Sequence, residues 1–208
     1  MKQIIHISFL LLLFSSCTSQ TNKTTGTIVG GPCEGCEAIY EYGDNDLNNI
    51  DTLPNFEHSN VPLKVSGTIY EMDTKTPAEN VILYVYHTNS EGIYETKGNE
   101  KGWGKRHGYI RGWIKTGKDG KYTFYTSRPA AYPNTDEPEH IHITVKEPKR
   151  NEYYIDAVVF SDDELLTSEN KKALTNRGGS GIVTPVNENG ILTVNRDIIL
   201  GLNIPNYE

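Results

Sequence analysis

Two histidines separated by a single residue, His140 and His142, are the first side chains in this chain whose types and spacing suit chemistry. On an extended strand successive side chains point to opposite faces, so both imidazoles project from one face while Ile141 projects from the other. Two imidazoles on one face can bind a single metal ion, but a His-x-His pair also occurs as two polar positions on a solvated strand face. The pair therefore indicates a metal site only if further ligands accompany it.

A proline-rich loop, residues 132–139, leads directly into this strand. A loop at the head of a ligand strand can deliver further ligands, because connecting segments often carry functional side chains on a rigid scaffold. Tyr132 is the candidate that this loop offers. The alternative is that its ring simply packs on Pro133, since tyrosine is common at half-buried positions of sheets.

The elements that must position these side chains are predicted to be strands. The 208 residues suffice for one domain with its own core, and the 19 Gly, 10 Pro and 13 Tyr suggest many turns between aromatic-bearing strands. The pattern predicts an all-β fold, a β-sandwich of about eight strands with Greek-key-like connections. A short surface helix is expected within residues 162–176. The expected strands are residues 63–72, 81–87, 109–116, 122–126, 140–146, 153–160, 181–186 and 191–200.

Residues 1–16 are predicted to be a secretory signal peptide. They contain one positive side chain, Lys2, an apolar run too short to span a bilayer, and two small serines before Cys17. This arrangement resembles a bacterial lipoprotein signal, with Cys17 as the lipidated first residue of the mature chain. Ordinary cleavage near Cys17 is the alternative, and both interpretations imply export. We therefore expect a protein anchored by lipid to the cell envelope, in the periplasm or at the outer membrane.

Residues 17–60 are expected to form a polar tether that reaches from the anchor and then packs on the domain, and residues 61–208 the β-sandwich domain. The tether contains Cys33 and Cys36, and such a pair usually oxidises outside the cytoplasm. A structural disulfide is favoured over a thioredoxin-like redox motif, which would open a helix after a strand. The pair could also be half of a zinc site, although the 3 Cys of the chain include no second pair to complete one.

Charge limits the partners of the chain. The formal net charge is −7 with the leader, and it becomes −8 when cleavage removes Lys2. Nucleic acid or an anionic membrane surface would call for a face rich in Lys and Arg, and the sequence shows none. We therefore expect no nucleic-acid partner, and membrane contact only through the lipid anchor.

Several segments, in their order and spacing, resemble the intradiol ring-cleavage dioxygenases, which are the catechol and protocatechuate dioxygenases and their smaller relatives. The segments are residues 81–94, 111–116, 119–126 and 128–133 together with His140-Ile141-His142. Each segment alone matches the family pattern only loosely, but the order and spacing of the whole set make the match fairly specific. The resemblance covers roughly residues 63–160.

The resemblance implies a ferric ion, Fe(III), held by Tyr94, Tyr132, His140 and His142, with Tyr132 and His142 as axial ligands and hydroxide beside them. Hard phenolate oxygens suit iron(III), and metal binding deprotonates a phenol that otherwise titrates at about pH 10. The resemblance further implies that a catechol-type substrate displaces hydroxide and Tyr132, which accepts a proton. Cleavage by O2 between the two hydroxyl-bearing carbons would follow.

One position departs from the family pattern. Family members usually carry an arginine three residues before the first histidine of the pair, where this chain has Glu137. A carboxylate there would repel a catecholate and could not stabilise developing negative charge. Either Arg111 or Arg128 then supplies the cation, or the substrate differs, or turnover is poor. The chain also lacks the helical N-terminal segment through which the catechol-specific branch dimerises, so a homodimer would have to form differently.

Two other interpretations stay open at this stage. Residues 67–69, 77–81 and 118–124 also resemble the transthyretin-like and carboxypeptidase-regulatory modules, metal-free β-sandwiches of exported proteins that need neither Tyr-Pro nor His-x-His. Tyr94 would then be an ordinary turn tyrosine. The other interpretation is a zinc or copper protein, for which His87 and His107 are the next ligands to test. Otherwise these two histidines lie at the surface or behind the ligands.

Overall fold

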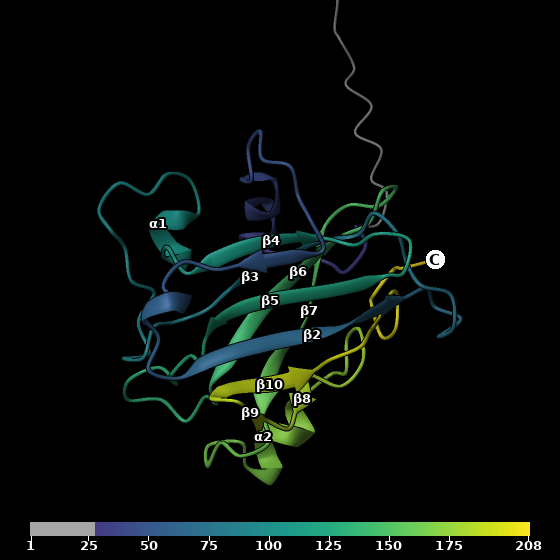
Figure 1. The fold of residues 1–208 in the computed structure, drawn as a ribbon. Coiled ribbons are helices and arrows are strands. Elements are labelled where there is room, and N and C mark those ends of the chain that lie inside the picture. The colour runs from purple at the N-terminus through teal and green to yellow at the C-terminus, as the bar shows by residue number, and fades with distance from the viewer. Residues whose placement is uncertain (1–27) are drawn as a thin grey trace, which may run out of the picture.

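Two β-sheets face each other in the computed structural model and form a sandwich (Figure 1), which confirms the predicted all-β fold. The structure describes residues 28–208, so the predicted signal peptide, residues 1–16, and the lipidation site Cys17 lie outside the described residues. The strands are β1 (Ile50–Thr52), β2 (Pro62–Tyr70), β3 (Ile82–Tyr86), β4 (Arg111–Lys115), β5 (Lys121–Ser127), β6 (His140–Lys146), β7 (Tyr153–Phe160), β8 (Ile182–Val183), β9 (Val186–Glu188), β10 (Ile191–Asn195) and β11 (Ile198–Ile199). The helices are η1 (Cys36–Tyr40) and η2 (Phe56–His58), both 3-10, and α1 (Gly104–His107) and α2 (Ser168–Ala173).

The first sheet has the strand order β1-β5-β2-β10-β9, with β11 also paired to β2, and the second has the order β4-β3-β6-β7-β8. Strands that follow each other in sequence, such as β2 and β3 or β5 and β6, lie in different sheets. Connections that cross from one sheet to the other are common in β-sandwiches. None of the helices within residues 28–208 is long and apolar enough to cross a bilayer.

The strand predictions hold best where the apolar pattern is longest. β6 and β7 have the predicted bounds, and β2 to β5 differ from prediction by one or two residues at each end. The predicted strand 181–186 is interrupted between β8 and β9, because Pro185 has no N–H to give to a ladder. The predicted strand 191–200 divides into β10 and β11. The helix α2 begins after Thr167, whose side chain caps the N–H of Asn170, so it is shorter than expected.

Apolar side chains of both sheets fill the space between them. On β5, Tyr122 and Phe124 are buried while Thr123 and Tyr125 are only partly buried, which is the alternation of a strand with one face in the core. The facing strands β3 and β6 contribute Leu83, Val85, Ile143 and Val145 to the same core. Full burial of such a side chain contributes about 1.5–3 kcal/mol. The inner faces of the sheets are therefore occupied by core packing, and polar functional side chains can lie on the outer faces and at the strand ends.

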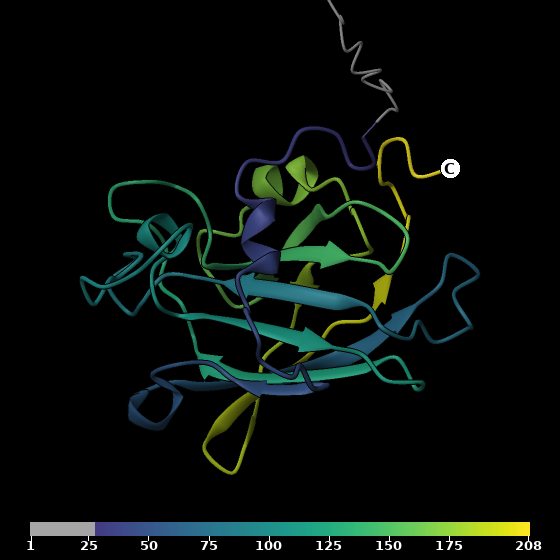
Figure 2. The same cartoon turned by 90° about the horizontal axis from the view of Figure 1, so that it is seen from above.

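The chain before β2 covers the outer face of the second sheet. The helix η1 lies over β3 and β6, as Figure 2 shows from above, and it buries Ala38 and Ile39 against Tyr84 of β3. Leu53, directly after β1, enters the main core. Residues 28–60 therefore pack against the sandwich. Their elements are too short to show a hydrophobic period in the sequence.

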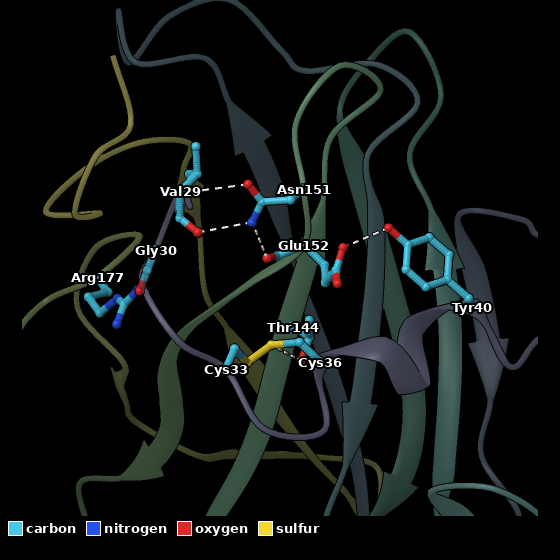
Figure 3. Close-up of a disulfide and its surroundings, with 9 residues drawn as sticks. All are labelled: Val29, Gly30, Cys33, Cys36, Tyr40, Thr144, Asn151, Glu152 and Arg177. Atoms are coloured by element: carbon cyan, nitrogen blue, oxygen red, sulfur yellow. Dashed lines mark hydrogen bonds between the residues drawn. A yellow bond between two sulfur atoms is a disulfide. The ribbon is translucent and has the colours of Figure 1, made fainter. Parts of the chain in front are cut away.

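Hydrogen bonds fix this N-terminal segment to the β6–β7 end of the sheet, and a disulfide closes a loop within the segment (Figure 3). The side-chain amide of Asn151 accepts a bond from Val29 N at 3.1 Å and donates one to Val29 O at 3.0 Å. Cys33 and Cys36 are joined by a disulfide. Two further bonds hold the segment, from Tyr40 to Glu152 and from Arg177 to the carbonyl of Gly30.

Candidate metal centre

Two loops at one end of the sandwich pack against each other, and each carries one of the candidate tyrosines. Asn89 orders the first loop, because its Oδ1 accepts hydrogen bonds from two backbone N–H groups of the following turn at 2.9 and 3.1 Å. Gly92 then passes the second loop so closely that a Cβ would lie 2.0 Å from the carbonyl oxygen of Ala131, and its φ is +76°. Glycine alone tolerates both conditions. This close approach brings Tyr94 next to Tyr132.

The two histidines lie at the start of β6 on its outer face. Ile141 and Ile143 belong to the core between the sheets, so alternation directs His140 and His142 outward. The pairing of β6 with β7 shifts between Ile141 and Ile143, which places an irregularity opposite His142, and such bulges often re-aim side chains at sites. Nδ1 of His140 lies 2.6 Å from the carbonyl oxygen of Pro138. A carbonyl only accepts, so Nδ1 carries the proton and Nε2 presents a lone pair to the site.

Four donor atoms of the predicted ligands converge at one point. Nε2 of His142 lies 2.8 Å from Oη of Tyr94, 3.4 Å from Oη of Tyr132 and 3.1 Å from Nε2 of His140. Nε2 of His140 lies 3.1 Å from Oη of Tyr132, and the two phenol oxygens are in direct contact. Two side chains from separate loops and two from one strand are therefore brought together.

The chemistry of this donor set fits a ferric ion. Metal–ligand bonds of about 2.0–2.2 Å at right angles place neighbouring donors roughly 3 Å apart, which is the spacing of the donor pairs that include a histidine nitrogen. Burial, with a contribution from His140, lowers the pKa of His142 to about 3, so its imidazole is neutral and able to bind a metal. Burial also raises the pKa of Tyr94 and of Tyr132. A trivalent cation would oppose that effect and favour the phenolates, which are hard oxygen donors suited to iron(III).

A cavity of about 330 Å³ opens onto this cluster. It is lined by Tyr94, Tyr132 and His142 and by Glu34, Tyr86, Trp103, Arg106 and His107. The volume lies at the lower end of the range for small-molecule sites, which suits a single substituted aromatic ring. A larger cavity of about 790 Å³ lies beside the C-terminus, and none of the four candidate ligands lines it.

The three residues predicted near substrate lie in different places. Oε1 of Glu137 is 3.9 Å from Nε2 of His140, so this carboxylate does lie beside the cluster, with its side chain 56% exposed. Arg111 is paired with one carboxylate and Arg128 with two, and neither lines the cavity. Neither of these arginines therefore reaches in to balance a bound anion.

The remaining histidines of the site region have partners of their own. His87 is 1% exposed, with Nδ1 2.7 Å from the carbonyl oxygen of Thr88 and Nε2 2.7 Å from Oγ1 of Thr126. Nδ1 of His107 lies 2.9 Å from Oη of Tyr84. Within residues 28–208, no group of three His, Cys, Asp or Glu side chains is arranged to hold a metal ion. Among the described residues, His87 and His107 therefore do not join His140 and His142 in the cluster that a zinc or copper site would need.

Four residues of the cavity wall were not identified from the sequence. Trp103 and Arg106 lie at α1 in the loop after β3, and Glu34 of the disulfide loop pairs with Arg106 across the rim. Tyr86 is the fourth, and it stands directly opposite His142 in the β3–β6 register. The period of two along β3 was a signal for Tyr86. The other three lie outside strands, where no period indicates which way a side chain points.

Part of the sequence is similar to a curated enzyme. Over 89 residues the chain is 35% identical to catechol 1,2-dioxygenase 1 of Acinetobacter lwoffii, and that stretch is 41% of this chain and 26% of that protein. The match thus spans about a quarter of that relative's length. No protein-family model matches the chain.

Several solved structures share the fold over most of the chain. The dioxygenase domain of a dioxygenase and carbohydrate-binding fusion protein from Streptomyces sp. SirexAA-E has a TM-score of 0.58 at 23% identity, over 81% of this chain and 95% of that chain. Hydroxyquinol 1,2-dioxygenase from Pseudomonas putida DLL-E4 has a TM-score of 0.55 at 18% identity, over 87% of this chain and 68% of that chain. Catechol 1,2-dioxygenase from Acinetobacter sp. ADP1 has a TM-score of 0.55 at 18% identity, over 74% and 58%. At these identities the likeness establishes a shared fold.

Proposed function

We propose that the protein is a non-haem iron(III) intradiol dioxygenase, which cleaves the ring of a catechol-type aromatic between its two hydroxyl-bearing carbons with O2. The observation that carries this proposal is the convergence of two phenol oxygens and two imidazole nitrogens at the wall of a ring-sized cavity. The fold shared with catechol and hydroxyquinol dioxygenases supports it. A metal-free binding module offers no reason to gather four such groups where burial makes their charged forms costly.

Each ligand has a role that its surroundings support. Tyr94, Tyr132, His140 and His142 would hold the ferric ion, which when bound supplies a Lewis acid that fixes both oxygens of an ortho-diphenol and makes its ring reactive toward O2. His140 turns its lone pair inward because Pro138 keeps the proton on Nδ1. Oη of Tyr132, in contact with Oη of Tyr94 and 3.1 Å from Nε2 of His140, is placed to receive a proton from a substrate hydroxyl.

The cavity wall supports the binding of an aromatic ring. Tyr86 and Trp103 contribute aromatic side chains to its wall, which help to exclude water. The guanidinium of Arg106 lies 5.3 Å from the ring centroid of Trp103 and pairs with Glu34 at the rim. Arg106 is the cation among the residues that line the cavity. It therefore supplies, at the rim of the cavity, the positive charge for which Arg111 and Arg128 were the candidates.

We also propose that the enzyme acts outside the cytoplasm and is anchored by lipid at Cys17. The pattern of residues 1–16 supports export, and the Cys33–Cys36 disulfide suits an oxidising compartment. Mass spectrometry of the mature protein tests the anchor, because a lipidated Cys17 adds the mass of its acyl groups and Cys17→Ser should release the protein from the membrane fraction. A mature N-terminus at another residue would refute it.

Purified protein reconstituted with iron(III) tests the enzyme assignment. Tyrosinate bound to ferric iron absorbs visible light, so the protein should be coloured, and Tyr132→Phe should bleach or shift the band. Tyr125→Phe is the matched control, because Tyr125 is a strand tyrosine that packs on Phe56 away from the site. Catechol should then be consumed together with O2 to give a muconate-type diacid. Wild-type protein that stays colourless with iron would refute the assignment.

A further inference from the structure

The two ligand histidines are supported in different ways. The ring of His140 is fixed by the bond from Nδ1 to the carbonyl oxygen of Pro138 at 2.6 Å. All the polar contacts of the His142 ring within residues 28–208 are made by Nε2 instead, to Tyr94, Tyr132 and His140. A metal-bound histidine usually donates its second ring N–H to a fixed acceptor, which sets the orientation of the ring. Something other than a protein hydrogen bond at Nδ1 must orient His142.

Aromatic stacking provides that support. Tyr86 stands opposite His142 in the β3–β6 register, and their ring centroids are 4.5 Å apart with an interplanar angle of 16°. Tyr86 also stacks on His107, at 3.9 Å and 8°. The two contacts confine the plane of Tyr86, and hence the plane of His142, because a parallel stack at this distance leaves no room for either ring to tilt.

The far end of this stack is held by the N-terminal segment. Nδ1 of His107 lies 2.9 Å from Oη of Tyr84, and a Cβ on Gly35 would lie 2.9 Å from Cε1 and Nε2 of His107. Gly35 is enclosed by the Cys33–Cys36 disulfide, whose half Cys36 is 2% exposed. Oγ1 of Thr144 on β6 lies 3.8 Å from Sγ of Cys36 (Figure 3). Contacts therefore run without interruption from the disulfide loop through the stack to His142.

We propose that Tyr86 and His107 are positioning residues for the metal ligand His142, and that the disulfide loop around Gly35 clamps their stack. This inference rests on the proposed metal site, but it concerns residues that touch neither iron nor substrate oxygen. The stack does for His142 what the Pro138 carbonyl does for His140. A rigid ring keeps Nε2 directed at the other three donors, so loss of the stack weakens metal binding even though all four ligands are retained.

Iron affinity of the full mature chain tests the stack directly. Competition with citrate measures the affinity for iron(III), and the visible band reports the geometry at the phenolates. Tyr86→Leu should lower the affinity about tenfold or more and shift or broaden the band, the usual scale for a residue that supports a ligand. Tyr86→Phe keeps the ring and should bind iron with an affinity indistinguishable from that of wild type. Tyr125→Leu, which removes a strand tyrosine that stacks on no ligand, is the matched control.

Thermal unfolding of each metal-free variant separates a local effect from loss of the fold, and Tyr86→Val replaces Tyr86→Leu if the latter does not fold. A folded Tyr86→Leu or Tyr86→Val with wild-type affinity and an unshifted band would overturn the inference and leave the proposed function standing. Wild-type protein that binds no iron would overturn the proposed function and this inference with it.

The clamp is tested by the double variant Cys33→Ser with Cys36→Ser. Freed from the disulfide, the loop holds His107 less firmly, so iron affinity should fall by about threefold or more while Tyr86 and His142 are unchanged. The same fall is expected when the disulfide of the wild-type protein is reduced before iron is added. Wild-type affinity in the folded double variant would overturn the role of the loop as a clamp.

Discussion

The buried ring of His87, near the candidate metal centre, is held in its neutral form by two hydrogen bonds. Nδ1 faces a carbonyl oxygen, that of Thr88, so it must donate, and Nε2 then accepts from the hydroxyl of Thr126. A neutral ring satisfies both partners. Because the side chain is 1% exposed, burial lowers the pKa of His87 to about 4.

This lowered pKa makes the free energy of unfolding depend on pH. The unfolded chain binds a proton at His87 below about pH 6.5, whereas the folded chain does so only near about pH 4. The contribution of the neutral His87 ring to the free energy of unfolding is therefore fully present above about pH 6.5. It is lost as the pH falls from there toward about 4. The full loss is about 3 kcal/mol, of which about 1 kcal/mol falls between about pH 7.5 and 5.5.

We expect His87→Gln to remove this dependence, because the amide of Gln can donate to the Thr88 carbonyl and accept from the Thr126 hydroxyl. Urea unfolding of the metal-free proteins at about pH 7.5 and 5.5 measures it, and wild type should lose about 1 kcal/mol more than the variant between the two conditions. His107 and His142, whose pKa burial also lowers, are present in both proteins and cancel from the comparison.

Equal losses in wild type and variant would refute the burial of a neutral His87. The comparison also tests the role of His87 in metal binding. Both of its ring nitrogens are engaged by Thr88 and Thr126, so the iron-reconstituted variant should keep its colour. A colourless but folded His87→Gln would show that this histidine is a ligand after all.

Three further predictions concern the loop glycine Gly92, the carboxylate Glu137 and the disulfide. Gly92→Ala should abolish the iron colour by forcing the Tyr94 loop away from Ala131, whereas Gly98→Ala, at a similar positive φ with open space around it, should retain the colour in visible spectra. Glu137→Arg should raise the rate of catechol loss by roughly 3- to 10-fold, because a favourable charge interaction of about 1 kcal/mol would lower the activation free energy. Asp136→Arg in the same exposed loop should leave the rate unchanged. Loss of the Cys33–Cys36 disulfide, which closes a loop of about four residues, should lower the free energy of urea unfolding by about 2 kcal/mol.

Local pattern predicted the strands and one half of the candidate site. A period of two is a property of neighbouring residues, so the alternation around Ile141 was enough to place His140 and His142 together on one face, and β6 begins and ends as predicted. The same reasoning applied to β3 would have placed Tyr86 on that outer face. Short elements such as β1 were not predicted, because three residues are too few to display a period.

The sequence by itself determined an all-β sandwich, the shared face of the two histidines and the type of each donor group. The meeting of Tyr94 with Tyr132 was decided by the tertiary structure, where Gly92 of one loop packs on the backbone of another. The tertiary structure also decided how the N-terminal segment packs on the sandwich and that Arg106, rather than Arg111 or Arg128, lines the cavity. The physical reason is that a strand's own stereochemistry fixes the direction of its side chains, whereas the direction of a loop side chain depends on contacts with residues distant in the chain.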